Sequence, residues 1–247
     1  MAFWRVASGA QRHQVAIEGL YHGASAFLVG ANPRVLQLDL RLLRLQGIYS
    51  MAINNAAILS EPNAVVMLDR PRCFNFNIFT NARILKLMDY IHRETDVEGQ
   101  RLSRFPNTLF YDCDEQVVED EFCADTGPMP GWRNTFFVAL AALKQMGFAN
   151  VYMIGCTFDI DKEKAYAYDH HLSDDLVDYN RKTYDQAVDR MKTLVPRIED
   201  SGMKLWTCHE RSGLDGIVDY IPYTSAISRC TRDGVPVIGN RIIHANE

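Results

Sequence analysis

Hydrogen-bonding side chains follow two short apolar segments of the sequence, where a nucleotide or a sugar phosphate could be bound. Gly30 and Asn32 come after SAFLV, and Asn54 and Asn55 come after YSMAI. Glycine lets a ligand approach the backbone, and each asparagine amide offers a donor and an acceptor to the edge of a base or ribose. Turn formation is the alternative at each position. The glycine loop is neither GxGxxG nor a Walker loop, which disfavours the usual dinucleotide and P-loop sites.

A polar loop later in the chain holds five further hydrogen-bonding residues, namely Tyr166, Tyr168, Asp169, His170 and His171. Tyrosine hydroxyls can donate to phosphate oxygens without adding charge, and a histidine can act as a general base near neutral pH. An exposed loop carrying polar residues by chance is the alternative. The density of such residues favours a functional loop.

Four more residues complete the candidate binding set. Asp69 and Gly155 each follow an apolar segment, and Asn134 and Thr135 precede the apolar stretch FFVALAALKQM. Either of the last two residues can cap a helix, and a helix N-terminus also attracts anions.

The acidic tripeptides of the chain are weaker candidates. Asp112 and Asp114 follow TLFY as a DxD pattern, which in many transferases holds a divalent cation, and Asp159 begins a second such pattern. Further acidic residues follow the first one. We therefore interpret both as solvated acidic segments and predict no metal site.

The elements that must position these residues are short and alternate along the chain. Apolar segments predict strands at 25–30, 47–53, 64–68, 108–111, 151–154 and 204–208, and helical spacing predicts helices at 38–45, 83–93, 134–146 and 179–198. This alternation predicts an α/β fold, a Rossmann-like, mostly parallel sheet with helices on both faces. Ligands bind beyond the carboxyl ends of such strands, so the candidate residues should meet at one edge of the sheet.

Composition sets the class of protein. The 247 residues are 47% hydrophobic and 23% charged with a net charge of −5, which excludes a disordered chain and disfavours binding to nucleic acid or anionic membrane by bulk charge. Residues 1–104 are net positive and residues 105–247 net negative, so the first half could face an anionic ligand. The cysteines show no zinc-like spacing, and neither a signal peptide nor a membrane span is visible. We expect a soluble, cytoplasmic protein.

With these residues in place, the chain resembles a superfamily of bacterial lipooligosaccharide sialyltransferases, flagellin-glycosylation proteins and archaeal 6-hydroxymethylpterin diphosphokinases. GANPRV at 30–35 resembles the GNGPSL-like loop of that superfamily, and AALKQMGFANVYMIGCTFD at 141–159 resembles its central strand region. AYAYD at 165–169 resembles the SYAFD segment of the sialyltransferases. The likeness spans about residues 24–225 of a single domain, residues 1–247, with a lid or acceptor loop at about 159–178.

The resemblance implies a metal-independent glycosyltransferase that moves a sugar from a nucleotide-activated donor to an acceptor hydroxyl, with no cofactor. His170 or His171 would be the general base, and the tyrosines would bind the donor phosphate. By position, the donor-binding residues would be Gly30, Asn32, Arg34, Asn54, Asn55, Asp69, Asn134, Thr135, Gly155, Tyr166 and Tyr168.

Departures from the family pattern keep two alternatives open. Arg34 replaces a small serine, so the loop could meet a diphosphate, and Thr157 stands where the family usually has an aspartate. One alternative is a Mg²⁺-dependent diphosphokinase that acts on a pterin-like alcohol and uses Asp69, Asp112 and Asp114. The other is a non-catalytic nucleotide-binding protein. The acceptor could be a glycan, a protein, a metabolite or a modified nucleic-acid base, and a homo-oligomer is compatible with the sequence.

Overall fold

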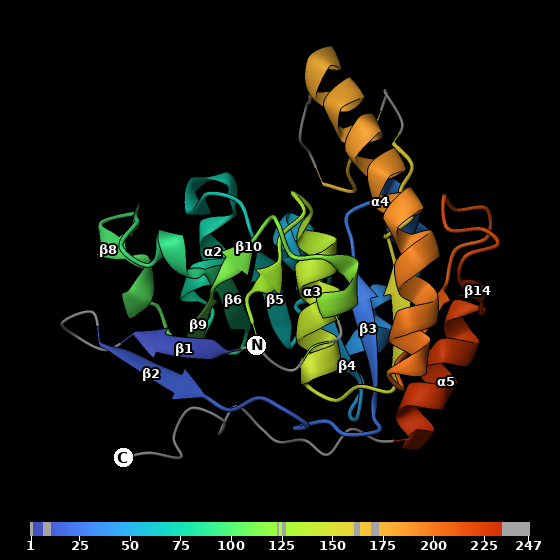
Figure 1. The fold of residues 1–247 in the computed structure, drawn as a ribbon, viewed down its shortest axis with the longest axis horizontal. Helices are drawn as coiled ribbons and strands as arrows, with labels where there is room; N and C mark the ends of the chain where they lie inside the picture. Colours follow the sequence, from blue (N-terminus) through green and yellow to red (C-terminus); the bar gives the residue numbers. More distant parts are fainter. Residues whose placement is uncertain are drawn as a thin grey trace.

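The computed structural model describes residues 2–6, 11–122, 124, 127–160, 164–168 and 173–233. Its main sheet consists of β1 (Phe3–Val6), β2 (Arg12–Val15), β3 (Ser25–Val29), β4 (Tyr49–Ile53), β5 (Ala64–Met67), β6 (Leu85–Asp89), β9 (Thr108–Tyr111), β12 (Asn150–Ile154), β13 (Lys204–Thr207) and β14 (Asp219–Tyr220). These strands lie in the order β14-β13-β12-β3-β4-β5-β6-β9-β1-β2. Neighbours from β14 to β9 are parallel, whereas β1 and β2 form an antiparallel edge (Figure 1).

The strand order reverses direction between β3 and β12. From β3 the chain adds β4, β5, β6 and β9 on one side, and from β12 it adds β13 and β14 on the other. Every residue of β3 and β5 is buried, as in parallel sheets covered on both faces. A reversal of this kind leaves a crevice beyond the carboxyl ends of the strands, where α/β folds bind ligands.

Helices cover both faces of the sheet. They are α1 (Ala57–Ser60), α2 (Phe76–Thr80), α3 (Thr135–Gln145), α4 (Asp174–Asp200) and α5 (Tyr223–Asp233). Side chains of α3 and α4 belong to the core on one face, and those of α1, α2 and α5 to the core on the other. In Figure 1 the first turns of α4 rise above the rest of the ribbon. The predicted fold class, a mostly parallel sheet with helices on both faces, is confirmed.

Shorter elements occupy the connections. The 3₁₀-helices are η1 (Pro33–Gln37), η2 (Leu40–Arg44), η3 (Asn54–Ala56), η4 (Pro71–Cys73), η5 (Tyr90–His92), η6 (Leu102–Arg104) and η7 (Glu119–Glu121). Two small sheets pair β7 (Asp96–Val97) with β8 (Gln100–Arg101), and β10 (Cys113–Asp114) with β11 (Met129–Pro130).

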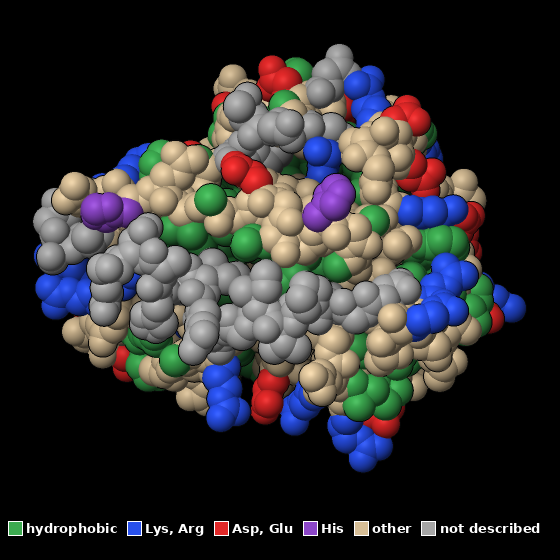
Figure 2. Space-filling view, turned by 90° about the horizontal axis from the view of Figure 1, so that it is seen from below, with side chains coloured by type: hydrophobic (Ala, Val, Ile, Leu, Met, Phe, Trp, Pro, Cys, Tyr) green, Lys and Arg blue, Asp and Glu red, His purple; other side chains and the backbone are tan. Residues whose placement is uncertain are grey.

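The surface agrees with the mixed charge of the composition. Among the residues drawn in colour in Figure 2, which shows the molecule from below, Lys and Arg side chains are interspersed with Asp and Glu. In the part of the chain that the structure describes, every helix is too short or too polar to span a bilayer. The cytoplasmic location stays a prediction.

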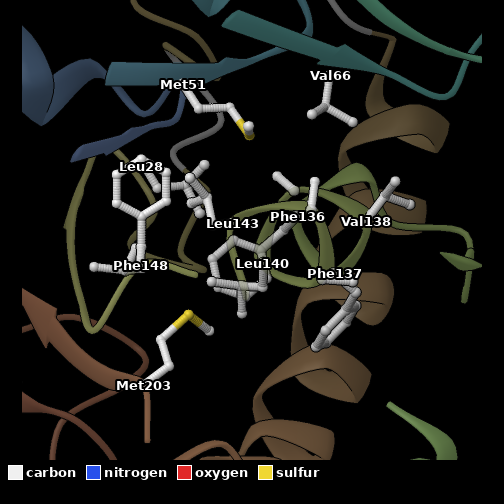
Figure 3. Close-up of a cluster of buried hydrophobic side chains, with 14 of the residues drawn as sticks. Leu28, Met51, Val66, Phe136, Phe137, Val138, Leu140, Leu143, Phe148 and Met203 are labelled. Atoms are coloured by element: carbon white, nitrogen blue, oxygen red, sulfur yellow. The ribbon is translucent and has the colours of Figure 1, made fainter. Parts of the chain in front are cut away.

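Helix α3 is buried nearly all round, as its apolar sequence predicts. Figure 3 shows its Phe136, Leu140 and Leu143 among the buried side chains that also include Met51 and Val66 of the sheet. Burial of each such large side chain stabilises the fold by about 2 kcal/mol. The predicted cap is also confirmed, because the Asn134 side chain accepts a hydrogen bond from the backbone N–H of Phe136 at 3.0 Å.

Two helix predictions differ from the structure. Within residues 38–45 the helix is shorter than predicted and is the 3₁₀-helix η2, Leu40–Arg44. The helix predicted at 83–93 is wrong, because this segment forms β6 followed by η5. The apolar spacing indicates a helix only if Lys86 lies at an exposed position, whereas Lys86 occupies a fully buried position of the strand. Its Nζ donates to the carbonyl oxygens of Phe79 at 3.3 Å and Asn81 at 2.8 Å. The antiparallel strands β1 and β2 and helix α5 were not predicted.

Candidate functional site

A cavity of about 470 Å³ lies at the reversal point of the sheet, beyond the carboxyl ends of β3, β4, β5 and β12. The first turn of α3, the second and third turns of α4 and the loop after β12 complete its wall. Its lining residues are Gly30, Ala31, Asn32, Ile53, Asn54, Leu68, Asp69, Glu115, Arg133, Asn134, Thr135, Phe136, Gly155, Cys156, Thr157, Phe158, Asp159, Ala165, Tyr166, Tyr168, Tyr179, Asn180, Thr183 and Tyr184. The structure thus brings together nine of the predicted donor-binding residues; Arg34 and Asn55 are not among the lining residues.

The floor of the cavity is a contact between two glycines, Gly30 and Gly155. A Cβ on Gly30 would lie 2.2 Å from the Gly155 carbonyl oxygen, and one on Gly155 would lie 2.5 Å from the Gly30 carbonyl oxygen. Gly155 also has a φ of +65°, which side-chain-bearing residues rarely adopt. The N–H of Gly30 donates to Ile154 at 2.8 Å and that of Asn32 to Gly155 at 3.0 Å, which joins the ends of β3 and β12. Only glycine permits this approach at either position.

A buried histidine, His209, forms a hydrogen bond to the backbone of the turn at Gly155. Nε2 of His209 accepts a hydrogen bond from the Gly155 N–H at 2.7 Å, and the side chain is 6% exposed. Burial lowers the pKa of His209 to about 4, with a contribution from the charge of Arg34, while Asp159 acts in the opposite direction. The imidazole is therefore neutral at neutral pH. From the sequence alone His209 had no recognisable role, and its position after an apolar strand was the only signal.

The two asparagines after β4 differ in their surroundings. Asn54 lines the cavity with a φ of +52°, and its buried Oδ1 has no hydrogen-bond partner among the described residues. Asn55 joins the neighbouring loop, since its Nδ2 donates to Cys73 at 3.0 Å and its Oδ1 accepts from the Asn75 N–H at 2.9 Å. Its side chain also lies beside the hydroxyl of Tyr168. A buried amide oxygen without a partner is costly unless a ligand supplies a donor, so Asn54 is the stronger binding candidate.

The tyrosine pair faces the asparagine loops. The rings of Tyr166 and Tyr168 stack with their centroids 5.2 Å apart, and Asn180 of α4 donates to the Tyr166 hydroxyl at 3.3 Å. Ala167 between them donates its N–H to the Ala31 carbonyl at 2.7 Å, which ties this segment to the glycine loop. Burial raises the pKa of each tyrosine above its ordinary value. Both hydroxyls therefore stay protonated at neutral pH and can donate to an anion.

A second wall is formed by the loop that leads into α3. Trp132 and Arg133 both have left-handed backbone, with φ of +41° and +53°. The Trp132 indole N–H donates to Val117 at 2.7 Å, and the Arg133 N–H donates to the Glu115 carboxylate at 2.7 Å. Such conformations cost free energy and persist where surrounding contacts impose them. Glu115 and Arg133 thereby line the cavity, although the sequence did not single out either residue.

Acidic residues show three different environments. Asp69 lines the cavity; its side chain reaches solvent, yet burial within the wall raises its pKa, with His92 acting in the opposite direction. Asp112 pairs with Arg12 at 3.1 Å, and neither Asp112 nor Asp114 lines the cavity. Within the described ranges, no group of three or more His, Cys, Asp and Glu is arranged to hold a metal ion.

Asp159 is only partly solvated, whereas its sequence context predicts a fully solvated residue. Its Oδ1 accepts from Nδ2 of Asn32 at 2.7 Å and from the Thr157 hydroxyl. Its Oδ2 lies 3.0 Å from Nη2 of Arg34. The reason for the error is that Asn32 and Arg34 come from the loop after β3, more than a hundred residues earlier. The predicted bases His170 and His171, like Asp169, lie outside the described residues.

No protein-family model matches the sequence, and no curated protein matches it either. The solved structures that are similar in fold include the following two. The MAf glycosyltransferase from Magnetospirillum magneticum AMB-1 is 11% identical with a TM-score of 0.50, over 93% of this chain and 40% of that one. The sialyltransferase CstII from Campylobacter jejuni, solved with cytidine-5'-monophosphate as a substrate analogue, is 15% identical with a TM-score of 0.48, over 81% of this chain and 86% of that one.

These identities show the fold alone. The chain spans less than half the length of MAf, so only the shared domain is compared. The fold is one found in glycosyltransferases, and it agrees with the superfamily that the sequence motifs resemble.

Proposed function

We propose that this chain is a glycosyltransferase that moves a sugar from a nucleotide-activated donor to an acceptor hydroxyl. The observation that carries the proposal is the convergence of neutral hydrogen-bonding groups around one cavity at the reversal point of the sheet. The unpartnered Oδ1 of Asn54 suits a donor group on a base or ribose. The hydroxyls of Tyr166 and Tyr168 suit the phosphate to which the sugar is attached.

The proposed reaction is an in-line displacement at the anomeric carbon. The acceptor oxygen forms a bond to that carbon as the bond to the donor phosphate oxygen breaks, and the phosphate leaves with the electron pair. Tyr166 and Tyr168 would donate hydrogen bonds as negative charge builds on the leaving oxygen, an interaction stronger in the transition state than in the ground state. His170 or His171 would take the proton of the acceptor hydroxyl. No metal is assigned a step.

The diphosphokinase alternative has less support from the cavity. Of the three carboxylates it would use, Asp69 lines the cavity, whereas Asp112 is paired with Arg12 and Asp114 accepts a hydrogen bond from the Gln116 N–H at 2.8 Å. ATP-dependent transfer that a chelator abolishes would support this alternative. Nucleotide binding without any turnover would support a non-catalytic protein.

The test is a panel of nucleotide sugars incubated with the full chain in EDTA, with released nucleotide measured by chromatography. We expect one donor to be hydrolysed or transferred, and we expect Tyr166→Phe and Tyr168→Phe to lower kcat by about 10²-fold, the usual effect of removing one donor to a developing oxyanion. Tyr220→Phe is the matched control, because Tyr220 is exposed and does not line the cavity. Replacing both His170 and His171 by alanine should abolish transfer. Unchanged turnover in these variants would show that the assigned roles are wrong.

A further inference from the structure

The charged side chains that the structure describes in the cavity wall are mostly acidic, which is unfavourable for the phosphate of the proposed donor. Among the described lining residues, the charged ones are Asp69, Glu115, Asp159 and Arg133. Three carboxylates against one guanidinium make this described part of the wall net negative, which disfavours a donor phosphate there. These described residues would bind a phosphate more tightly if a carboxylate moved away and a further cation became available.

One rearrangement would meet both conditions. Arg34 lies behind the wall, with Nη2 3.0 Å from Oδ2 of Asp159. Its Nη1 donates to the carbonyl oxygens of Glu210, at 3.2 Å, and Arg211, so the guanidinium is held facing Asp159 from behind. Removal of the Asp159 carboxylate would leave this guanidinium without its charged partner, next to the cavity wall that Asp159 lines.

The groups around the carboxylate are those that would bind a phosphate. Asp159 is contacted by a guanidinium from Arg34, an amide from Asn32 at 2.7 Å and a hydroxyl from Thr157. Guanidinium, amide and hydroxyl donors recognise carboxylate and phosphate oxygens in the same way, and the guanidinium can engage two oxygens at once. These donors come from the loops after β3 and β12, directly beside the Gly30–Gly155 contact on the cavity floor.

The ion pair between Arg34 and Asp159 is also accessible to solvent and weak enough to be replaced. The side chains of Arg34 and Asp159 are 36% and 40% exposed. Ion pairs of this exposure contribute little net stability, because water screens them and their side chains lose freedom. A phosphate, with more charge and more acceptor oxygens than a carboxylate, would make stronger bonds to the same donors.

We propose that Asn32, Arg34 and Thr157 form an anion subsite that binds the phosphate of the donor together with the hydroxyls of Tyr166 and Tyr168, and that the Asp159 carboxylate occupies this subsite until the donor displaces it. This inference rests on the proposed function and specifies the charge of its substrate. It makes Asp159 a competitor of the ligand, so that neutralising it should strengthen binding. An aspartate that merely supported the fold would have no such effect.

The test is the affinity for inorganic pyrophosphate, a probe that carries only the anion, measured by calorimetry on the full chain in EDTA. We expect Asp159→Asn to tighten binding by about ten-fold, which corresponds to about the effect of one nearby charge. Arg34→Gln should weaken it, and adding Arg34→Gln to Asp159→Asn should remove the gain. The matched control is Asp39→Asn, which breaks a surface pair with Arg41 and changes the net charge equally, but does not line the cavity. The affinity of the Asp39→Asn variant for pyrophosphate should equal that of the unaltered chain.

Two outcomes would overturn the inference. One is an affinity that Asp159→Asn leaves unchanged or that Asp39→Asn raises equally. The other outcome is a pyrophosphate affinity that Arg34→Gln leaves unchanged. This outcome can be measured even if Asp159→Asn does not fold. The proposed function is judged separately by donor turnover. If a donor is turned over with a KM that Asp159→Asn leaves unchanged, the subsite is wrong while the glycosyltransferase stands. If pyrophosphate binds as expected but no donor is used, the subsite stands alone.

Discussion

Substituting Gly30 by alanine should destabilise the whole domain, although the change adds a single methyl group. The new Cβ would lie 2.2 Å from the carbonyl oxygen of Gly155, 2.7 Å from its carbonyl carbon and 2.8 Å from Sγ of Cys156. The first two atoms are backbone, so neither can rotate away as a side chain could. The ends of β3 and β12 would have to separate by about an ångström at the centre of the sheet.

The cost can be worked from the contacts that this separation would break. Overpacking of a rigid interior costs about 1–3 kcal/mol. The hydrogen bonds from Gly30 to Ile154, at 2.8 Å, and from Asn32 to Gly155, at 3.0 Å, cross the same junction, and losing each would cost about 1 kcal/mol more. We expect a total loss of about 3–5 kcal/mol in the free energy of unfolding. For a chain of this size that corresponds to a fall in Tm of roughly 6–20 °C.

Urea denaturation followed by fluorescence or circular dichroism measures this loss. Gly99→Ala is the matched control, because Gly99 has a φ of +84° and no atom lies within 4 Å of the place that the new methyl group would take. It should lose only the cost of left-handed backbone, about 1–2 kcal/mol. If Gly30→Ala were no more destabilised than Gly99→Ala, the two strand ends would be free to separate, and the tight floor of the cavity would be refuted.

Two further predictions concern the pH dependence of stability, each measured as the free energy of unfolding at a series of pH values. The pKa of His209, about 4, lies below the ordinary 6.5, so the unfolded chain binds the proton more readily, and stability should fall by up to about 3 kcal/mol as pH drops from 7 to 4. His209→Gln, which keeps an acceptor for the Gly155 N–H, should flatten this part of the profile; an unaltered slope would mean that another group titrates. The pKa of Lys86, lowered by burial to about 8 from 10.5, should make stability rise by about 3 kcal/mol between pH 8 and 10.5 relative to Lys86→Met. Parallel profiles for the two proteins would contradict the burial of a charged lysine.

Local pattern was sufficient for the class of fold and for most of the cavity. Uninterrupted apolar segments specify parallel strands with both faces covered, and the carboxyl ends of parallel strands lie at one edge. That geometry alone brings Gly30, Asn54, Asp69 and Gly155 together. Asn134 could be identified as a cap because capping involves only the next few residues. By contrast, the role of β6 could not be inferred, because its lysine is satisfied by backbone carbonyl groups outside the strand.

Only the tertiary structure decided the contacts between residues that are far apart in the chain. The sequence by itself determined the α/β class, the succession of most strands and helices along the chain, and the residue types at the strand ends. Each of these features depends on neighbouring residues within one element. Only the folded chain shows that Asp159 pairs with Arg34, that His209 accepts a hydrogen bond from the Gly155 N–H, and that Glu115 lines the cavity. The physical reason is that the charge and protonation of a site depend on every group that packs around it, and those groups come from several elements at once. In this protein, the sequence predicts that Asp159 is solvated, whereas the structure places its carboxylate in the proposed phosphate subsite.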